Sequence, residues 1–127
     1  NVILGDEEKI LYGKGYIYDT LLDNQYKISL KSFYQINPIQ VEKLYQTAID
    51  LAHINQDSVV LDAYCGIGTI TLSLAKHVKK IYGVEVVPQA IEDAKNNALL
   101  NKNRYSDYNE TADLLIHQQA GCKFIDV

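Results

Sequence analysis

The chain has 127 residues, 47% of them hydrophobic, which suits one folded domain with a packed core and excludes a wholly disordered chain. No apolar run approaches the roughly 20 residues needed to cross a bilayer, so we expect no membrane association. The net charge of −4 and the two cysteines exclude a strongly basic nucleic-acid binder and a disulfide-built scaffold. We therefore expect a cytoplasmic protein with reduced thiols, and we predict no metal site.

Residues 1–36 are predicted to form a β-rich segment ahead of an α/β domain over 37–127. Tyr16–Tyr18 and Tyr26–Leu30 have the composition of strands, and glycine, aspartate and asparagine around them favour turns. This pattern predicts a hairpin or flap. The chain contains no methionine and does not begin with one, so we expect it to be part of a longer protein.

A helix is predicted to begin at Asn37-Pro38 and to fade near residues 53–55. Asparagine is a good N-cap, proline suits the first turn, and Gln40 completes a pair resembling a capping box. Apolar residues at helical spacing predict its buried face: Val41, Leu44, Tyr45, Ala48, Leu51 and Ala52.

The next segments alternate between strands and helices. The apolar run Ser58–Asp62 predicts a strand covered on both faces, followed by a glycine loop over 63–68. A helix over 69–79, a strand over 80–85 and a helix over 88–101 should follow. The predicted inward residues of the first helix are Ile70, Leu74, Ala75 and Val78. Those of the second helix are Ile91, Ala94 and Ala98, with Leu99 at the border of the buried face.

This order predicts part of a Rossmann-like, doubly wound α/β fold. Two parallel strands do not make a stable sheet, so residues 104–127 should supply at least one more. Lys123–Val127 is the candidate strand, and Asp113–Gln119 is a candidate helix.

The main chemical signal is a glycine loop with acidic residues at two strand ends. Gly66 and Gly68 follow the first strand of the α/β domain, where a sharp turn and close approach of a ligand to the backbone both favour glycine. Glu85 ends the next strand, close to the ~20-residue spacing at which an acid binds ribose hydroxyls. A dinucleotide site would have a third glycine where Thr71 stands. S-adenosylmethionine (SAM) has no phosphate and needs no anion cradle, so the pattern favours SAM.

Each of these residues also has a purely structural interpretation. The two glycines would then only shape a tight turn, and Glu85 would be a solvated strand end. Asp62 would hold either the ligand ammonium or the loop amides, and these remain equal alternatives. Tyr64 would pack along the ligand or in the core. Cys65 is favoured as a small buried hydrophobe over a thiolate nucleophile.

Beyond these motifs, residues 1–103 resemble the RNA uracil-C5 methyltransferases, and most of all the 23S ribosomal RNA enzymes of Gram-positive bacteria. An element with Phe33, Gln35 and Asn37, placed ahead of a Tyr-Cys-Gly-x-Gly loop, is quite specific to that family. SAM enzymes in general share only the glycine loop and the acid. The matching segments are Ser32–Pro38, Asp62–Thr69 and Tyr82–Glu85.

The resemblance implies a set of SAM contacts. Gln35 would contact the methionine end, where its amide offers both a donor and an acceptor. Tyr64 would lie in the SAM pocket and Glu85 would bind the ribose. Thr69 stands where some members carry an asparagine that contacts SAM. The full predicted cofactor-binding set is Gln35, Asp62, Tyr64, Gly66, Gly68, Thr69 and Glu85.

In this family a cysteine thiolate adds to uracil C6, which makes C5 nucleophilic, and a general base later removes the C5 proton. Those groups lie downstream of an Asp-Pro-Pro segment that this chain lacks. Neither Cys65 nor Cys122 matches the nucleophile motif, and the family's accessory RNA-binding module would precede residue 1. We therefore predict no catalytic residue here and expect the isolated chain to be inactive.

The parent protein is thus expected to be a SAM-dependent enzyme that methylates uridine C5 in RNA, with 23S ribosomal RNA as its partner. Three alternatives stay open: a SAM methyltransferase with another acceptor, a nicotinamide-dependent oxidoreductase, and a cofactor-binding or structural fragment without activity.

Overall fold

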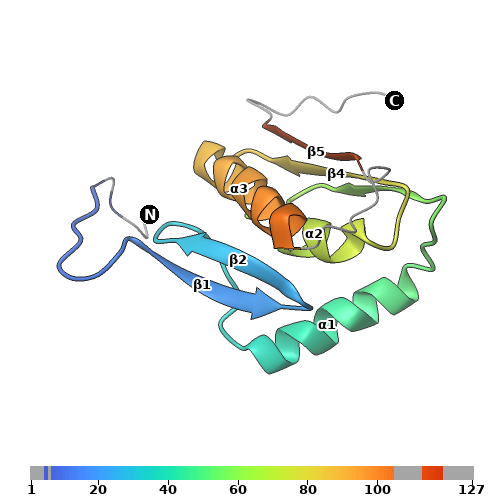
Figure 1. Ribbon diagram of the computed structural model, residues 1–127, viewed down its shortest axis with the longest axis horizontal. Helices are drawn as coiled ribbons and strands as arrows, with labels where there is room; N and C mark the ends of the chain where they lie inside the picture. Colours follow the sequence, from blue (N-terminus) through green and yellow to red (C-terminus); the bar gives the residue numbers. More distant parts are fainter. Residues whose placement is uncertain (1–4, 6, 105–112, 119–127) are drawn as a thin grey trace.

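The computed structural model describes residues 5, 7–104 and 113–118 (Figure 1). Its elements, in chain order, are β1 (Tyr16–Leu21), β2 (Asn24–Ser29), α1 (Pro38–Leu51), β3 (Val59–Asp62), α2 (Thr69–Ala75), β4 (Lys80–Glu85), α3 (Pro88–Arg104) and β5 (Asp113–Gln118). Within these residues, no helix has both the length and the apolar character that a membrane span requires.

The strands β3, β4 and β5 form a parallel sheet in that order. In Figure 1, α2 and α3 lie between this sheet and the layer that contains the β1–β2 hairpin and α1. Parallel strands joined through helices make this the α/β fold that the sequence predicted.

The β1–β2 hairpin turns through Leu22 and Asp23, whose φ angles of 47° and 67° suit the right-handed twist of a two-residue hairpin loop. Its register pairs Leu21 with Asn24 and Tyr18 with Lys27. Directly opposed residues share a face, so the hairpin has a buried face and an outer face. The division of the chain at residue 36 remains a prediction.

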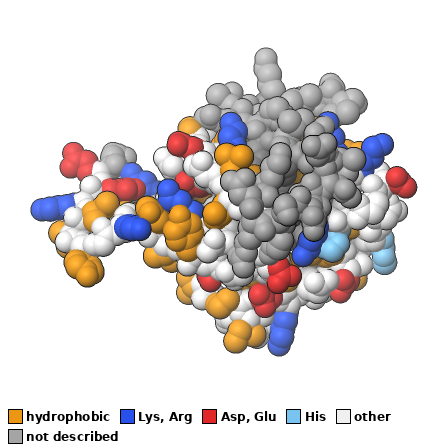
Figure 2. All heavy atoms as spheres, viewed as in Figure 1, with side chains coloured by type: hydrophobic (Ala, Val, Ile, Leu, Met, Phe, Trp, Pro, Cys, Tyr) orange, Lys and Arg blue, Asp and Glu red, His pale blue; other side chains and the backbone are white. Residues whose placement is uncertain are grey.

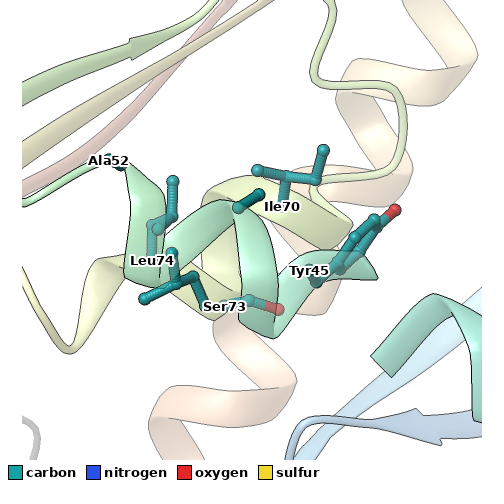
Figure 3. A pocket seen from close by; sticks show the side chains of 7 residues that line it. Tyr45, Ala52, Ile70, Ser73 and Leu74 are labelled. Carbon is teal, nitrogen blue, oxygen red and sulfur yellow. The ribbon is translucent and has the colours of Figure 1, made fainter. Parts of the chain in front are cut away.

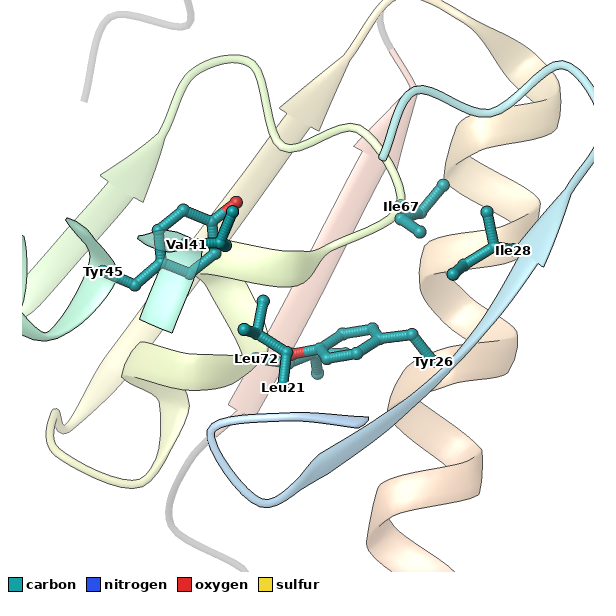
Figure 4. Packing of buried hydrophobic residues seen from close by; sticks show 7 residues of the cluster. All are labelled: Leu21, Tyr26, Ile28, Val41, Tyr45, Ile67 and Leu72. Carbon is teal, nitrogen blue, oxygen red and sulfur yellow. The ribbon is translucent and has the colours of Figure 1, made fainter. Parts of the chain in front are cut away.

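The buried face of the hairpin belongs to the largest hydrophobic cluster. The cluster joins the hairpin, α1, the glycine loop and α2, as Figure 4 shows: Leu21, Tyr26, Ile28, Val41, Tyr45, Ile67 and Leu72. Ile67 of the glycine loop is almost fully buried in it. The core therefore fixes the loop on which the candidate site depends.

Helix α1 begins as predicted, because the Asn37 side chain accepts a hydrogen bond from the Gln40 N–H at 3.2 Å and Pro38 occupies the first turn. Its predicted buried face is largely wrong, since Leu44, Ala48, Leu51 and Ala52 are exposed and only Val41 and Tyr45 of the predicted residues are buried. Val41 and Tyr45 pack in the largest hydrophobic cluster, and Ile49 packs against a second cluster that contains Leu74 of α2. Farther along, α1 and α2 leave an apolar groove of about 210 Å³ (Figure 3).

Residues 113–118 form a strand, so the helix predicted over Asp113–Gln119 is wrong. The strand pairs with β4 over its whole length, and this pairing satisfies an edge that a helix would have left open. The expectation of one more strand after residue 104 is confirmed. The candidate strand Lys123–Val127 lies outside the described residues.

Helix α2 ends at Ala75 instead of residue 79. The chain tightens there through a bond from the His77 N–H to the Leu74 carbonyl at 2.9 Å, and the Lys79 N–H bonds the Ser58 carbonyl at 3.0 Å. The helix therefore ends before residue 79, because the chain there already bonds to the residue that precedes β3 and leads into β4. The inward positions Leu74, Ala75 and Val78 are confirmed, whereas Ile70 is exposed. In α3, Ile91 and Ala94 are buried and Leu99 is exposed.

Within the described residues, only one face of β3 is covered, contrary to the predicted two-sided burial. Val59 and Leu61 are 64% and 61% exposed, whereas Val60 packs against a core cluster with Ile81. The helices α2 and α3 both contact β4 on the side of Ile81, and no other described element covers the opposite side.

Candidate functional site

The glycine loop over 63–68 lies at the carboxyl ends of β3 and β4, where ligands bind in open α/β sheets. The Cys65 N–H donates to the Val84 carbonyl at 3.0 Å, and the Gly68 N–H donates to the Cys65 carbonyl at 2.8 Å. These two bonds fasten the loop to the end of β4 and close it into a tight turn.

The two glycines of the loop have different roles. Both have positive φ angles, 53° at Gly66 and 86° at Gly68, which favour glycine. A Cβ at Gly68 would meet the Ala94 Cβ at 3.4 Å, so this glycine lets α2 approach α3. A Cβ at Gly66 would meet nothing within 4 Å, so the backbone there faces open space. Gly66 is therefore the position where a ligand can approach the main chain.

The Glu85 carboxylate joins the two loops at this edge of the sheet. One oxygen accepts from the Gly66 N–H at 3.2 Å, and the other accepts from the Val86 and Val87 N–H groups at 2.7 and 3.0 Å. A carboxylate has about four lone-pair sites, so three backbone bonds leave one acceptor site for a further donor. Glu85 is thus an anchored carboxylate, and the interpretation as a merely solvated strand end does not describe it.

Asp62 has a partner that neither interpretation from the sequence named. Its carboxylate accepts a hydrogen bond of 2.6 Å from the hydroxyl of Thr71, which is fully buried in α2. Gly83 lies beneath this pair, and a Cβ there would come within 3.1 Å of Cys65 and 3.2 Å of the Thr71 hydroxyl oxygen. Thr71, which stands where a dinucleotide site would have its third glycine, therefore orients the Asp62 carboxylate.

Cys65 is buried inside the loop. Burial, together with the negative charges of Asp62 and Glu85, raises the pKa of its thiol to about 12. A thiol with so high a pKa stays protonated near neutral pH and is a poor nucleophile. This agrees with the sequence-based preference for a small buried hydrophobe.

The remaining predicted cofactor-binding side chains are those of Tyr64, Thr69 and Gln35. Tyr64, within the loop, is 90% exposed, so it does not pack in the core. The Thr69 hydroxyl lies 3.0 Å from the Tyr45 hydroxyl and is engaged with α1. Gln35 is exposed. Its segment is fastened to α3 through Ser32, whose hydroxyl donates to Asp93 at 2.8 Å.

Sequence reasoning missed the buried asparagine that supports the loop. The Asn97 amide of α3 donates to the Ile67 carbonyl at 3.2 Å. It also pairs with Lys27 of β2, accepting from its N–H at 2.7 Å and donating to its carbonyl at 3.2 Å. Asn101, one turn later, pairs in the same way with Gln25. The available signal was two asparagines four residues apart on the apolar face of a predicted helix.

Solved structures define the class of this fold. The chain superposes on the Pyrococcus abyssi tRNA (uracil-54, C5)-methyltransferase in complex with S-adenosyl-L-homocysteine with a TM-score of 0.70 and 28% identity, over 94% of this chain and 27% of that one. It also superposes on Methanocaldococcus jannaschii TYW2 in complex with AdoMet, with a TM-score of 0.62 and 27% identity over 85% and 46% of the two chains. The fold is that of the Rossmann-like, SAM-dependent methyltransferases.

The particular family follows from the sequence comparisons. The profile of the tRNA (uracil-5-)-methyltransferase family matches residues 2–107, and the chain belongs to this family. It is 56% identical over 101 residues to an uncharacterized RNA methyltransferase of Oceanobacillus iheyensis and 58% identical over 102 residues to one of Staphylococcus aureus. These matches cover 80% of this chain but 22% of each relative, so the chain spans about a fifth of their length.

Proposed function

We propose that this chain forms the methyl-donor side of an RNA (uracil-5-)-methyltransferase and binds SAM at the edge formed by Asp62, Gly66 and Glu85. The observation that carries the proposal is the anchored Glu85 carboxylate beside the open backbone of Gly66. When bound, SAM supplies a methyl group on a sulfonium. Family membership and the two ligand-bound neighbours support the assignment.

The residues present suit SAM in two respects. Glu85 retains an acceptor site for a ribose hydroxyl while its other sites hold the loops in place. Gly66 leaves space against the main chain for an adenosine or methionine group. We extend the site to Gln35 and Tyr64, whose side chains are both exposed, and assign Gly68, Thr69 and Thr71 to its support.

Isothermal titration calorimetry with SAM and S-adenosylhomocysteine tests the site. Gly66→Ala should abolish or strongly weaken binding, because its methyl group enters the space assigned to the ligand. Glu85→Gln should weaken binding too, and Glu92→Gln, an exposed glutamate of α3, is the matched control. Binding of NAD in place of SAM, or unchanged SAM affinity in Gly66→Ala, would contradict the proposal.

We further propose that the whole protein methylates C5 of a uridine in 23S ribosomal RNA and works in the cytoplasm. The isolated chain should not form 5-methyluridine, since neither cysteine matches the family's nucleophile motif. Incubation with labelled SAM and ribosomal RNA tests this expectation. Formation of 5-methyluridine by the chain alone would show that the reasoning about the missing groups is wrong.

A further inference from the structure

The outer face of the β1–β2 hairpin carries a cluster of aromatic and basic side chains. Tyr16 and Tyr18 project from this face of β1, and their rings meet edge to face with centroids 5.5 Å apart. The Lys27 ammonium lies 4.4 Å from the Tyr16 ring centroid, and the Lys14 ammonium lies 5.7 Å from it. We call Lys14, Tyr16, Tyr18 and Lys27 the hairpin cluster.

The register of the hairpin explains why these side chains gather on one face. Tyr18 is directly opposite Lys27, and Lys27 lies between Tyr26 and Ile28, which are both buried. Figure 2 shows blue lysine side chains beside orange side chains in the region where Figure 1 places the hairpin. The cluster therefore lies on the side of the hairpin that faces away from the hydrophobic core.

Nearby acidic groups do not neutralise the two lysines. The Asp19 carboxylate accepts from the Thr20 N–H at 2.8 Å and from the Tyr34 hydroxyl, while Glu8 pairs with Lys31 at 3.7 Å. Neither Lys14 nor Lys27 forms an ion pair with an acidic residue in the described part of the chain. Although the whole chain carries a net charge of −4, charges farther away than about 8 Å are largely screened at physiological salt.

We propose that the hairpin cluster is a contact surface for single-stranded RNA. Tyr18, with 52% of its surface exposed, presents a ring on which an unpaired base can stack. Lys27 and Lys14 supply positive charge for the adjoining phosphates. Tyr16 orients the cluster, because both lysines and Tyr18 contact its ring.

The chemistry favours an unpaired strand over other nucleic acids. Bases inside a duplex are stacked on each other and offer no face to a tyrosine, whereas unpaired bases do. The inference rests on the proposed function, because an enzyme that modifies uridine must hold RNA whose bases are accessible. The cluster would hold nucleotides that flank the one to be methylated.

Fluorescence anisotropy with a labelled uridine dodecamer at low salt tests the proposal on the full chain. Tyr18→Val keeps strand propensity and should weaken binding at least ~5-fold, the lower end of the loss on removing one base stack. Lys27→Gln should weaken binding and reduce the slope of log K against log salt by about 0.7. Circular dichroism should show both variants folded.

A second tyrosine–lysine pair provides the matched control. Tyr82 of β4 lies 5.3 Å from the Lys80 ammonium, and Tyr82→Val should leave RNA binding unchanged. The proposal is overturned if the chain does not bind the dodecamer, if Tyr82→Val and Tyr18→Val weaken binding equally, or if duplex RNA binds as tightly and is insensitive to Tyr18→Val.

Calorimetry with S-adenosylhomocysteine on the same samples separates this proposal from the cofactor assignment. Cofactor binding without RNA binding would refute the hairpin cluster alone. RNA binding that depends on Tyr18, without cofactor binding, would refute the cofactor site and leave the RNA surface in place.

Discussion

Replacing Asn97 by leucine is expected to destabilise the fold and loosen the glycine loop together. The side chain is fully buried and makes three hydrogen bonds, two to Lys27 and one to Ile67. Leucine has a similar volume but no polar atoms, so it leaves one N–H and two carbonyl groups of the main chain without these partners. Deleting a buried partner in this way costs about 1–3 kcal/mol for each group left unpaired.

The magnitude follows from how buried each bond is. The two bonds to Lys27 are partly buried and water can replace them in part, so we take about 1 kcal/mol for each. The bond to the Ile67 carbonyl is buried, which places its loss at about 1–3 kcal/mol. The total of about 3–5 kcal/mol is a large share of the 5–15 kcal/mol that stabilises a typical domain.

Chemical denaturation followed by circular dichroism measures this loss. Asn96→Leu is the matched control, since Asn96 is the preceding residue of α3 and is exposed; it should change stability by less than about 0.5 kcal/mol. Any Asn97→Leu protein that remains folded should also bind SAM more weakly, because the Ile67 carbonyl is released. A loss below about 1 kcal/mol, or one equal to that of the control, would refute the reasoning.

Two substitutions and one reactivity measurement probe the site directly. Gly68→Ala should cost about 1–2 kcal/mol in urea denaturation, because φ is 86° and the new Cβ meets a methyl group of α3 at 3.4 Å; an unchanged midpoint would contradict this. Thr71→Val should cost about 1.5–3 kcal/mol by removing the 2.6 Å bond to the charged Asp62, and thermal melts at pH 7 measure it. Cys65, studied in a Cys122→Ser background, should react with a thiol reagent at pH 8 far more slowly in the folded than in the unfolded chain. Because its folded pKa of about 12 exceeds that of an unfolded cysteine, the neutral thiol's contribution to stability is present at neutral pH and is lost as the pH rises from about 9 to 12.

The order of most elements was predictable from local patterns. Asn37-Pro38 marks a helix start through its own side chain and ring, and the apolar run at 59–62 followed by two glycines marks a strand and a tight turn. These signals depend only on residues close together in the chain, so they can be read from the sequence before the fold is known. Residues 113–118 were misassigned because a short apolar run fits a helix or a strand equally well, and only pairing with β4 decides between them.

The sequence by itself determined the α/β class, the place of the glycine loop and the acid that follows it. The tertiary structure decided which glycine faces open space and which packs against α3, and it revealed that Thr71 orients Asp62 and that Asn97 supports the loop. It also gathered Lys14, Tyr18 and Lys27 on one face of the hairpin. The physical reason is distance along the chain: a hydrogen bond between Asn97 and Lys27 joins residues 70 positions apart, and no local pattern encodes it.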